Sequence, residues 1–379
     1  MARINTRSPY WLSIDDTEIS YAILKLYVYT GNSSNVPSQP TYTIRKSALS
    51  GQDIVWFEIS ELVRDELDII FDGDYNGQAV WVKIDTFAYN SSGDEISDDN
   101  ETIIAFDGYD YFEQQGADEG NIMITNRELF VLEDNTFRLP IYTGLNAPTV
   151  TFYKDGEIIA SETFTYDQDS SNQIKYVSIY GDDTNWDTFE ERVLAETGGV
   201  YENTVCLQSF FNNYSIGAVD KIEVSSTKGI ETIKVNVLEE CKYEPKKITF
   251  INKFGALQDM YFFKKAVEMM TVEKETYKAN TISNGTYSRS SHVNRDFNVV
   301  GKESVTLSSG FLSEEYNEVF KQMMLSEKVW ITNIIETGEQ VLPINVTTSD
   351  ITYKTSLNDK LVEYTIEFDN SYNTINNIR

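Results

Sequence analysis

The sequence predicts a mainly β protein in which tandem β-sandwich domains precede a β-sandwich with one flanking α-helix. The 379 residues include 24 Tyr and 20 Phe, and aromatic residues favour strands because they pack well on a pleated, half-buried surface. Short apolar segments separated by turn residues recur along the chain, which is also typical of sheets. A single amphipathic segment near the C-terminal end predicts the helix.

The length and the charge distribution indicate three domains. At about 100–200 residues per domain, two to four are expected, and we predict domains at 1–117, 118–244 and 245–379. Residues 1–117 contain 20 acidic and 7 basic side chains, residues 118–243 contain 22 and 9, and residues 244–379 contain 18 and 15. Like charge opposes close packing of identical subunits. The nearly neutral last third is therefore the part best suited to contact copies of this chain.

The net charge of −29 excludes some partners. A surface this acidic repels phosphate backbones, so we expect no sequence-specific binding of nucleic acid. No stretch approaches 18 apolar residues and the N-terminus has no apolar signal core, so we expect no membrane span. Cys206 and Cys241 are too few for a disulfide framework, which indicates synthesis in a reducing cytoplasm, with Cys206 as a small buried hydrophobe.

An internal echo links the first two predicted domains. Tyr-Thr-Gly ends an apolar stretch at 29–31 and again at 142–144, and a Pro-Thr pair follows at 40–41 and at 148–149. The two elements recur after 113 and 108 residues, which is the size of one β-sandwich domain. We therefore predict two Ig-like β-sandwiches that arose by duplication or share a domain type.

Turn residues beside apolar stretches predict the elements of these two domains. The Asp-Gly pair at 155–156 is the strongest signal, because Asp-Gly between apolar strands favours a hairpin. A short helix within 57–67 is expected to be capped by Ser60. Its inward side chains are expected to be Leu62, Val63 and Leu67. Strands are predicted at 79–85, 149–153 and 158–160, and as two segments between 221 and 237.

The last third is predicted to hold strands, one helix and a long polar segment. Residues 280–297 are rich in Ser, Asn, Thr and Arg and do not alternate, so we expect a long loop or an extended arm of the kind that a partner orders. In 361–368, apolar and polar residues alternate, which predicts a half-buried strand. Further strands are predicted at 247–252, 260–263 with a possible extension over 269–277, 304–307, 328–331 and 341–346.

The helix is predicted over residues 313–325. Ser313 is expected to be the N-cap, followed by Glu314 and Glu315 in the first turn, where the helix dipole favours negative charge. One apolar stripe is formed by Tyr316, Val319, Phe320, Met323 and Met324. The other face carries Glu314, Glu318, Lys321 and Gln322. We expect the stripe to cover one side of a β-sandwich and the polar back to face solvent or a neighbouring subunit.

Nothing in the sequence predicts catalysis or a bound cofactor. A single histidine, His292, is too few for a histidine triad or a multi-histidine zinc site within one chain, and we expect it to be an exposed loop residue. The glycine motifs that bind nucleotide phosphates are missing. Paired carboxylates can cleave glycosides, but among 60 acidic residues some pair lies close by chance. We therefore expect no enzyme, no cofactor and no catalytic residue.

One segment partly matches a calcium-binding loop. Asp72, Asp74 and Asn76 would supply oxygen ligands and Gly77 the sharp turn. The twelfth position is Lys83, where a bidentate Glu is needed, and a strand follows in place of a helix. We predict a hairpin turn and no metal site here, with weak calcium binding as the alternative. The acidic segment 94–101 is expected to be a solvated loop.

The last third resembles the tail-tube-like proteins of bacteriophage tails. The residues that carry the resemblance are 305–310 (VTLSSG), the helical segment 311–330 and the terminal segment 351–368. Residues 251–256 (INKFGA) also look like a segment that recurs in phage tail and baseplate-region proteins. The resemblance covers residues 245–379 as a pattern without a diagnostic motif. It implies a tail-tube-like β-sandwich with one helix on its flank, assembled as a ring, with the two sandwiches in front as decorating or docking domains.

Two hypotheses for function follow. The first is a non-catalytic virion structural protein of a bacteriophage tail, made in the host cytoplasm, whose partners are copies of itself in a ring and other tail proteins. Candidate interface residues are Arg289, His292 and Arg295 in the polar segment and Glu315, Glu318 and Lys321 on the helix. The second is a surface- or carbohydrate-binding protein in which exposed Tyr and Trp stack on sugars, although we expect the aromatic residues to lie mostly in the core.

Overall fold

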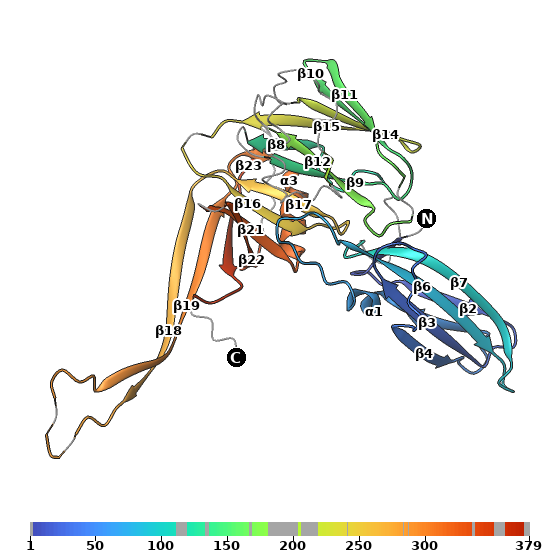
Figure 1. Ribbon diagram of the computed structural model, residues 1–379, viewed down its shortest axis with the longest axis horizontal. Helices are drawn as coiled ribbons and strands as arrows, with labels where there is room; N and C mark the ends of the chain where they lie inside the picture. Colours follow the sequence, from blue (N-terminus) through green and yellow to red (C-terminus); the bar gives the residue numbers. More distant parts are fainter. Residues whose placement is uncertain are drawn as a thin grey trace.

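The chain is mainly β, as predicted, and it folds into several sandwich-like sheets. The computed structural model describes residues 3–110, 120–132, 136–166, 169–180, 204–205, 219–240, 242–282, 284–286, 288–335, 338–351 and 361–374. Within these residues, each sheet draws its strands from only one of the three predicted domains. The first sandwich and a long two-stranded arm leave the body in different directions, so the molecule has the outline of an open V (Figure 1).

The first sandwich packs a five-stranded sheet, in the order β1-β7-β6-β3-β4, against the pair β2-β5. In β3, Ala22, Leu24 and Leu26 are buried and alternate with half-buried residues, because successive side chains of a strand point to opposite faces. The strands are β1 (Arg3–Asn5), β2 (Trp11–Asp15), β3 (Tyr21–Tyr29), β4 (Tyr42–Ser47), β5 (Ile54–Glu58), β6 (Ala79–Tyr89) and β7 (Glu95–Phe106).

The second sandwich has one sheet in the order β11-β10-β14-β15-β8 and another in the order β13-β12-β9. Its core is a separate cluster in which Leu139, Val150 and Ile222 are fully buried. The strands are β8 (Glu128–Leu132), β9 (Thr136–Tyr142), β10 (Thr149–Lys154), β11 (Glu157–Thr163), β12 (Ile174–Tyr180), β13 (Thr204–Val205), β14 (Lys221–Ser226) and β15 (Gly229–Leu238).

The two sandwiches share a strand topology. Strand β1 pairs in parallel with β7, and β8 pairs in parallel with β15. From there the larger sheets continue as β7-β6-β3-β4 and β15-β14-β10-β11, and the pair β2-β5 corresponds to β9-β12. This correspondence supports a shared domain type, which the sequence echo predicted.

The echo itself, however, matches strands that are not equivalent. The first Tyr-Thr-Gly begins at the end of β3 and the second at the end of β9. In the shared topology β9 corresponds to β2, and β3 corresponds to β10. The alignment of residues 29–31 with 142–144 was therefore wrong, although the domain type that it indicated agrees with the topology.

The third part is a seven-stranded sheet in the order β17-β16-β21-β22-β24-β19-β18 with helix α3 (Tyr316–Leu325) against one face. Phe320 is fully buried, with ring centroids 6.2 Å from Phe262 and 4.6 Å from Tyr364. The strands are β16 (Lys246–Ile251), β17 (Leu257–Phe262), β18 (Ala266–Lys278), β19 (Asn294–Ser308), β20 (Leu312–Ser313), β21 (Val329–Ile335), β22 (Gly338–Val346), β23 (Leu361–Val362) and β24 (Thr365–Asn370).

Four of the five residues of the predicted apolar stripe of α3 are buried, and Met324 is half-buried. The start of the helix and its polar face differ from the prediction. Ser313 belongs to β20, which pairs with β23, and the helix begins at Tyr316 with Glu315 as an N-cap that makes no side-chain cap bond. Gln322 is fully buried. Its side-chain amide group donates to Thr125 Oγ1 (3.0 Å), and its side-chain oxygen accepts from the Lys253 N–H (3.2 Å). The polar back of the helix therefore partly faces the rest of the same chain.

Two strand predictions in the last third also need correction. Residues 269–277 do not extend the strand at 260–263; they belong to β18, at the opposite edge of the sheet from β17. The segment 361–368 is two strands, β23 and β24, although the side chains of Val362, Tyr364 and Ile366 are buried as the alternation predicted.

Three predictions in the first sandwich were wrong in detail. Helix α1 (Ser60–Arg64) has Ile59 as its N-cap, and the Glu58 carboxylate accepts hydrogen bonds from the backbone N–H and the hydroxyl of Ser60. Ser60 therefore does not cap the helix. The segment 72–77 is not a hairpin turn, because β5 pairs with β2 and the chain reaches β6 without an intervening strand. Residues 95–101 belong to β7, so the predicted acidic loop at 94–101 is largely strand.

The three parts meet at a buried polar junction. The Tyr75 hydroxyl donates to Asp259 Oδ1 (2.6 Å), which also accepts from Thr249 Oγ1 (2.8 Å). Arg138 lies over the Tyr75 ring, 4.5 Å from its centroid, and its guanidinium donates to the Tyr75 hydroxyl (3.4 Å). Tyr75, Arg138 and Asp259 come from the first, second and third parts. This junction therefore joins all three through hydrogen bonds that water does not reach.

Candidate interaction site: the arm and the hollow at its root

The most unusual feature of the surface is the arm, a hairpin formed by β18 and β19. The two strands pair from Ala266 with Leu307 to Lys278 with Asn294, with a register shift between Glu273 and Glu275. The hairpin leaves the sheet and continues beyond the body (Figure 1). Strand β18 is the last strand of the sheet, so its outer edge pairs with no other strand among the described residues.

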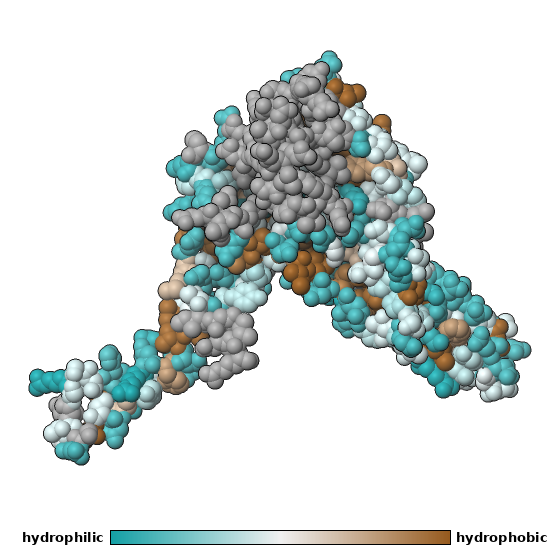
Figure 2. Space-filling model, in the orientation of Figure 1, coloured by the Kyte–Doolittle hydropathy of each residue, from teal (hydrophilic) through white to brown (hydrophobic). Residues whose placement is uncertain are grey.

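The arm exposes apolar side chains on both strands. Residues 267–277 place apolar groups at both odd and even positions, so neither face of the ribbon is purely polar. Hydrophobic atoms line the arm near its root (Figure 2). The exposed large apolar side chains of β18 and β19 are Val267, Met269, Met270, Val272, Tyr277, Phe297 and Val299. Clusters of exposed apolar side chains are typical of interaction surfaces.

The polar segment predicted as a loop or arm is the tip of this hairpin. Arg289 and His292 lie in the turn region, and the Arg295 guanidinium donates to the His292 carbonyl (3.2 Å). All three are exposed. Residues 294–297, however, are not loop but the first residues of β19, paired with β18. The structure therefore brings these three candidate residues together at one end of the molecule.

The other three candidate residues lie on α3, away from the tip. The Glu315 carboxylate accepts from the Arg127 backbone N–H (2.7 Å), so it contacts the second sandwich of the same chain. Glu318 and Lys321 form an ion pair with a separation of 3.2 Å. The six candidates therefore form two separate groups.

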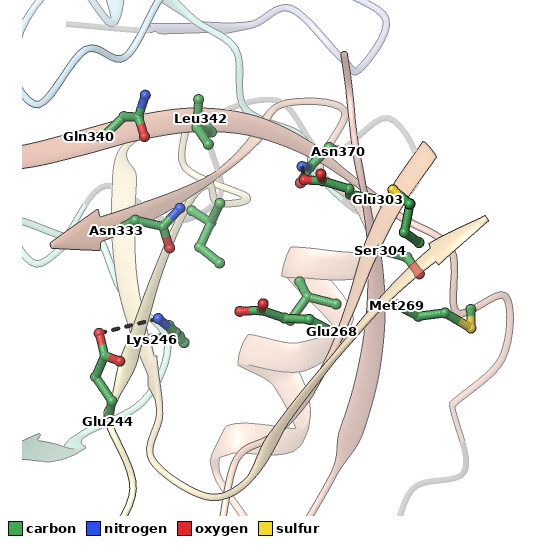
Figure 3. Close-up of a pocket in the computed structure, with 13 residues that line it drawn as sticks. Glu244, Lys246, Glu268, Met269, Glu303, Ser304, Asn333, Gln340, Leu342 and Asn370 are labelled. Carbon is green, nitrogen blue, oxygen red and sulfur yellow. Dashed lines mark hydrogen bonds and ion pairs between the residues drawn. The ribbon is translucent and has the colours of Figure 1, made fainter. Parts of the chain in front are cut away.

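A hollow of about 600 Å³ lies at the root of the arm. It continues the face of the sheet that α3 covers, since Val305 and Ile331 contribute both to that core and to the hollow. Its charged side chains are Glu244, Lys246, Glu268 and Glu303, and the ammonium of Lys246 is 3.3 Å from the Glu244 carboxylate. Figure 3 shows these side chains around the open space, together with Asn333, Gln340 and Asn370.

The sequence did not identify this hollow or the apolar strands of the arm. The lining of the hollow comes from six strands, β16, β18, β19, β21, β22 and β24, and extends in sequence from Glu244 to Asn370. The signal that could have indicated the arm is the loss of alternation in residues 267–277, because a strand with one buried face keeps its apolar residues on one parity.

Two further predictions concern metals and membranes. Within the part of the chain that the structure describes, no group of three or more His, Cys, Asp or Glu side chains is placed to hold a metal ion. None of the described helices is long and apolar enough to cross a membrane. Cys206 and Cys241 lie outside the described residues, so the predictions about them stay predictions.

Comparisons with known proteins add little. No family model matches the chain, and no curated protein matches it. Among solved structures, a "Crystal structure of CBD12 from CALX1.2" is similar over 46% of this chain and 70% of that chain, with 15% sequence identity and a TM-score of 0.18. Likeness at this level carries no argument about function, so the proposals below rest on the residues of this chain.

Proposed function

We propose that this chain is a non-catalytic structural subunit of a bacteriophage tail that assembles into a ring with copies of itself. The observation that supports assembly is the arm. Met269, Met270 and Val272 are each about half exposed. They lie on the last strand of the sheet among the described residues, and the unpaired backbone groups of such an edge are a template for pairing with another chain. In an isolated subunit these apolar side chains stay in contact with water, whereas in an assembled ring a neighbouring subunit would bury them.

The tail part of the proposal rests on the resemblance of residues 245–379 to tail-tube-like proteins. The charge distribution is consistent with it. The last third contains 18 acidic and 15 basic residues, so neighbouring copies repel one another least there. The two acidic sandwiches would then lie on the outside of the ring, where they contact other tail proteins. The virion is the proposed location.

The experiment is to shorten the arm and follow assembly. Residues 271–302 are replaced by Asn-Gly, because Met270 and Glu303 face each other across the hairpin and Asn-Gly closes a two-residue turn. We expect light scattering after size exclusion to give a defined oligomer for the native chain and a monomer for the shortened chain, with little change in melting temperature. Since some ring proteins assemble only on a partner, class averages of virions by cryo-electron microscopy are decisive. Averages without a ring of this chain would refute the proposal.

A second candidate function is binding to surface carbohydrate, and one observation favours it. Trp11 and Trp56 are each 45% exposed, so the expectation that the aromatic residues lie mostly in the core fails for these two. Trp11 faces Glu58 and Trp56 faces Ser13 across β2 and β5. The two indoles are therefore diagonal neighbours on the outer face of this pair of strands.

Glycan arrays with the native chain and with the Trp11→Ala/Trp56→Ala variant test this alternative. Glycans that bind the native chain but not the double variant would support carbohydrate binding. Tyr372→Ala, which removes another exposed aromatic side chain (55% exposed) far along the chain, is the control. Absence of any retained glycan counts against this function and leaves the ring proposal unaffected.

A further inference from the structure

We propose that the tip of one copy's arm docks in the hollow at the root of the next copy's arm. This inference rests on the proposed self-assembly and names the two surfaces that meet. It also commits to one occupant of the hollow, a second copy of this chain.

The charges of the two surfaces are complementary. Among the described residues that line it, the hollow carries the carboxylates of Glu244, Glu268 and Glu303 and one ammonium, that of Lys246. The tip runs from Lys278 to Arg295 and contains no Asp or Glu between those two residues, in a chain whose net charge is −29. Arg289, His292 and Arg295 are exposed there. Guanidinium groups bind carboxylates well because their planar N–H donors fit the two oxygens.

The hollow also suits side chains better than a whole strand. At about 600 Å³ it falls in the size range of sites that bind small molecules, so it admits one or two long side chains of the tip. Asn333, Gln340 and Asn370 add amide groups to its wall, and amide oxygens accept hydrogen bonds from guanidinium groups. Val305, Ile331 and Leu342 add apolar side chains to its lining, against which the stem of an arginine can pack.

A copy cannot fill its own hollow. The hollow includes Glu268 and Met270, near the start of β18, whereas the tip begins after Lys278. At about 3.3 Å per residue, the ten residues from 268 to 278 place the tip about 30 Å away along the paired strands of the hairpin. The tip therefore reaches only another molecule.

This contact joins two different surfaces of the same chain. A heterologous contact, repeated from copy to copy, generates a ring when the rotation closes and a filament when it does not. The tip and the hollow thus supply the directional contact that a ring needs, and the apolar flanks of the arm lie along the neighbouring body.

The test is a charge swap in the full-length chain. Glu268→Arg/Glu303→Arg reverses the hollow, and Arg289→Glu/Arg295→Glu reverses the tip. We expect each double variant to raise the concentration at which half of the chains are assembled by about tenfold or more, and the quadruple variant to restore assembly. Light scattering after size exclusion measures this, and circular dichroism confirms that each variant is folded.

Two controls make the outcome specific. Glu157→Arg makes the same kind of charge change at an exposed position of β11, far from the arm in Figure 1, and should leave assembly unchanged. Glu268→Arg alone keeps the Glu303 contacts with Asn370 and Thr374, so it tests the hollow if the double variant folds poorly.

The results separate this inference from the proposed function. If the native chain assembles and the reversals have no effect, or if the quadruple variant stays dissociated, the tip and the hollow do not meet and the inference is overturned, while the ring stands. If the native chain forms no assembly in solution or in virions, both are overturned.

Discussion

The junction around Tyr75 and the arm of β18 and β19 differ in the kind of side chain that each buries or exposes. The junction buries polar groups from three distant segments, and the arm exposes apolar groups that a core would normally cover. Buried polar groups and exposed apolar patches are the informative exceptions to the rule that apolar residues lie inside. The junction pairs its polar groups mainly with one another within one chain, although Asp259 Oδ2 has no hydrogen-bond partner among the described residues. The apolar groups of the arm, by contrast, stay exposed in the single chain. Stability should therefore depend on the junction and the cores, and assembly on the arm.

Replacing phenylalanine with aspartate should lower stability far more in the core than on the arm, and this is the largest difference that we expect. Phe320→Asp places a carboxylate at a fully buried site on α3, between the rings of Phe262 and Tyr364. We expect it to lower the free energy of unfolding by about 5 kcal/mol or to unfold the last third, because a lost aromatic contact and an unpaired buried charge add. Thermal melts followed by circular dichroism measure this.

Phe297→Asp is the matched control, since Phe297 lies on the arm and is 45% exposed. We expect its melting temperature to stay within a few degrees of the native value, because surface changes cost at most about 0.5 kcal/mol. Equal stability of the Phe320→Asp and native chains would refute the assigned face of α3.

Alkaline pH should weaken the buried regions and spare the arm. Burial, reinforced at the Tyr75 hydroxyl by the Asp259 carboxylate, raises the pKa of Tyr75 well above its ordinary value. Burial also raises the pKa of Tyr176 and of Tyr316. Above about pH 10 the unfolded chain loses these three protons and the folded chain keeps them, so stability falls as pH rises. Well above pH 10, each tyrosine contributes about 1.4 kcal/mol per pH unit to this fall, and the three together contribute about 4 kcal/mol per pH unit.

Urea unfolding between about pH 9 and 11 measures this slope. Tyr75→Phe should reduce the loss of stability across this whole interval by about 1.4 kcal/mol. Identical slopes for the native chain and Tyr75→Phe would mean that the Tyr75 hydroxyl is not buried at the junction.

At neutral pH, Tyr75→Phe should have a smaller effect. It removes the hydroxyl that donates to Asp259 and accepts from Arg138, and it leaves the Asp259 carboxylate with its Thr249 contact. We expect a loss of about 1–3 kcal/mol, because a buried charged acceptor loses one donor. Urea unfolding at pH 7 measures it, and Tyr277→Phe should cost less than about 0.5 kcal/mol. If Tyr75→Phe lowers the free energy of unfolding as little as Tyr277→Phe does, the hydroxyl at the junction contributes no more to stability than one at the surface.

The sequence predicted what depends on local periodicity. The spacing of Tyr316, Val319 and Phe320 gave the buried face of α3, and the alternation of Val362, Tyr364 and Ile366 gave the buried positions near the end of the chain. These predictions hold because a side chain's direction follows from the helix or strand that carries it.

What depends on pairing between distant residues was not predicted. Tyr75, Arg138 and Asp259 meet only once the three parts are packed, and nothing in 72–77 distinguishes a junction from a turn. Ser313 has the chemistry of an N-cap, but pairing with β23 places it in a strand. The arm was foreseen only at its tip, because 269–277 predicts a strand but not the edge on which it lies.

The smallest effect is expected for a polar pair at the surface, which contrasts with the buried pair at the junction. Glu318 and Lys321 are one turn apart on α3, 3.2 Å from each other, with side chains that remain about one-third exposed. Glu318→Ala should change the free energy of unfolding by no more than about 0.5 kcal/mol, because water screens such a pair and alanine favours a helix. Urea unfolding at about 0.05 M and 0.5 M salt measures it, and any difference should shrink at the higher salt. If Glu318→Ala lowers the free energy of unfolding by more than about 1 kcal/mol at both salt concentrations, Glu318 makes a buried contact, as Gln322 does with the rest of the chain.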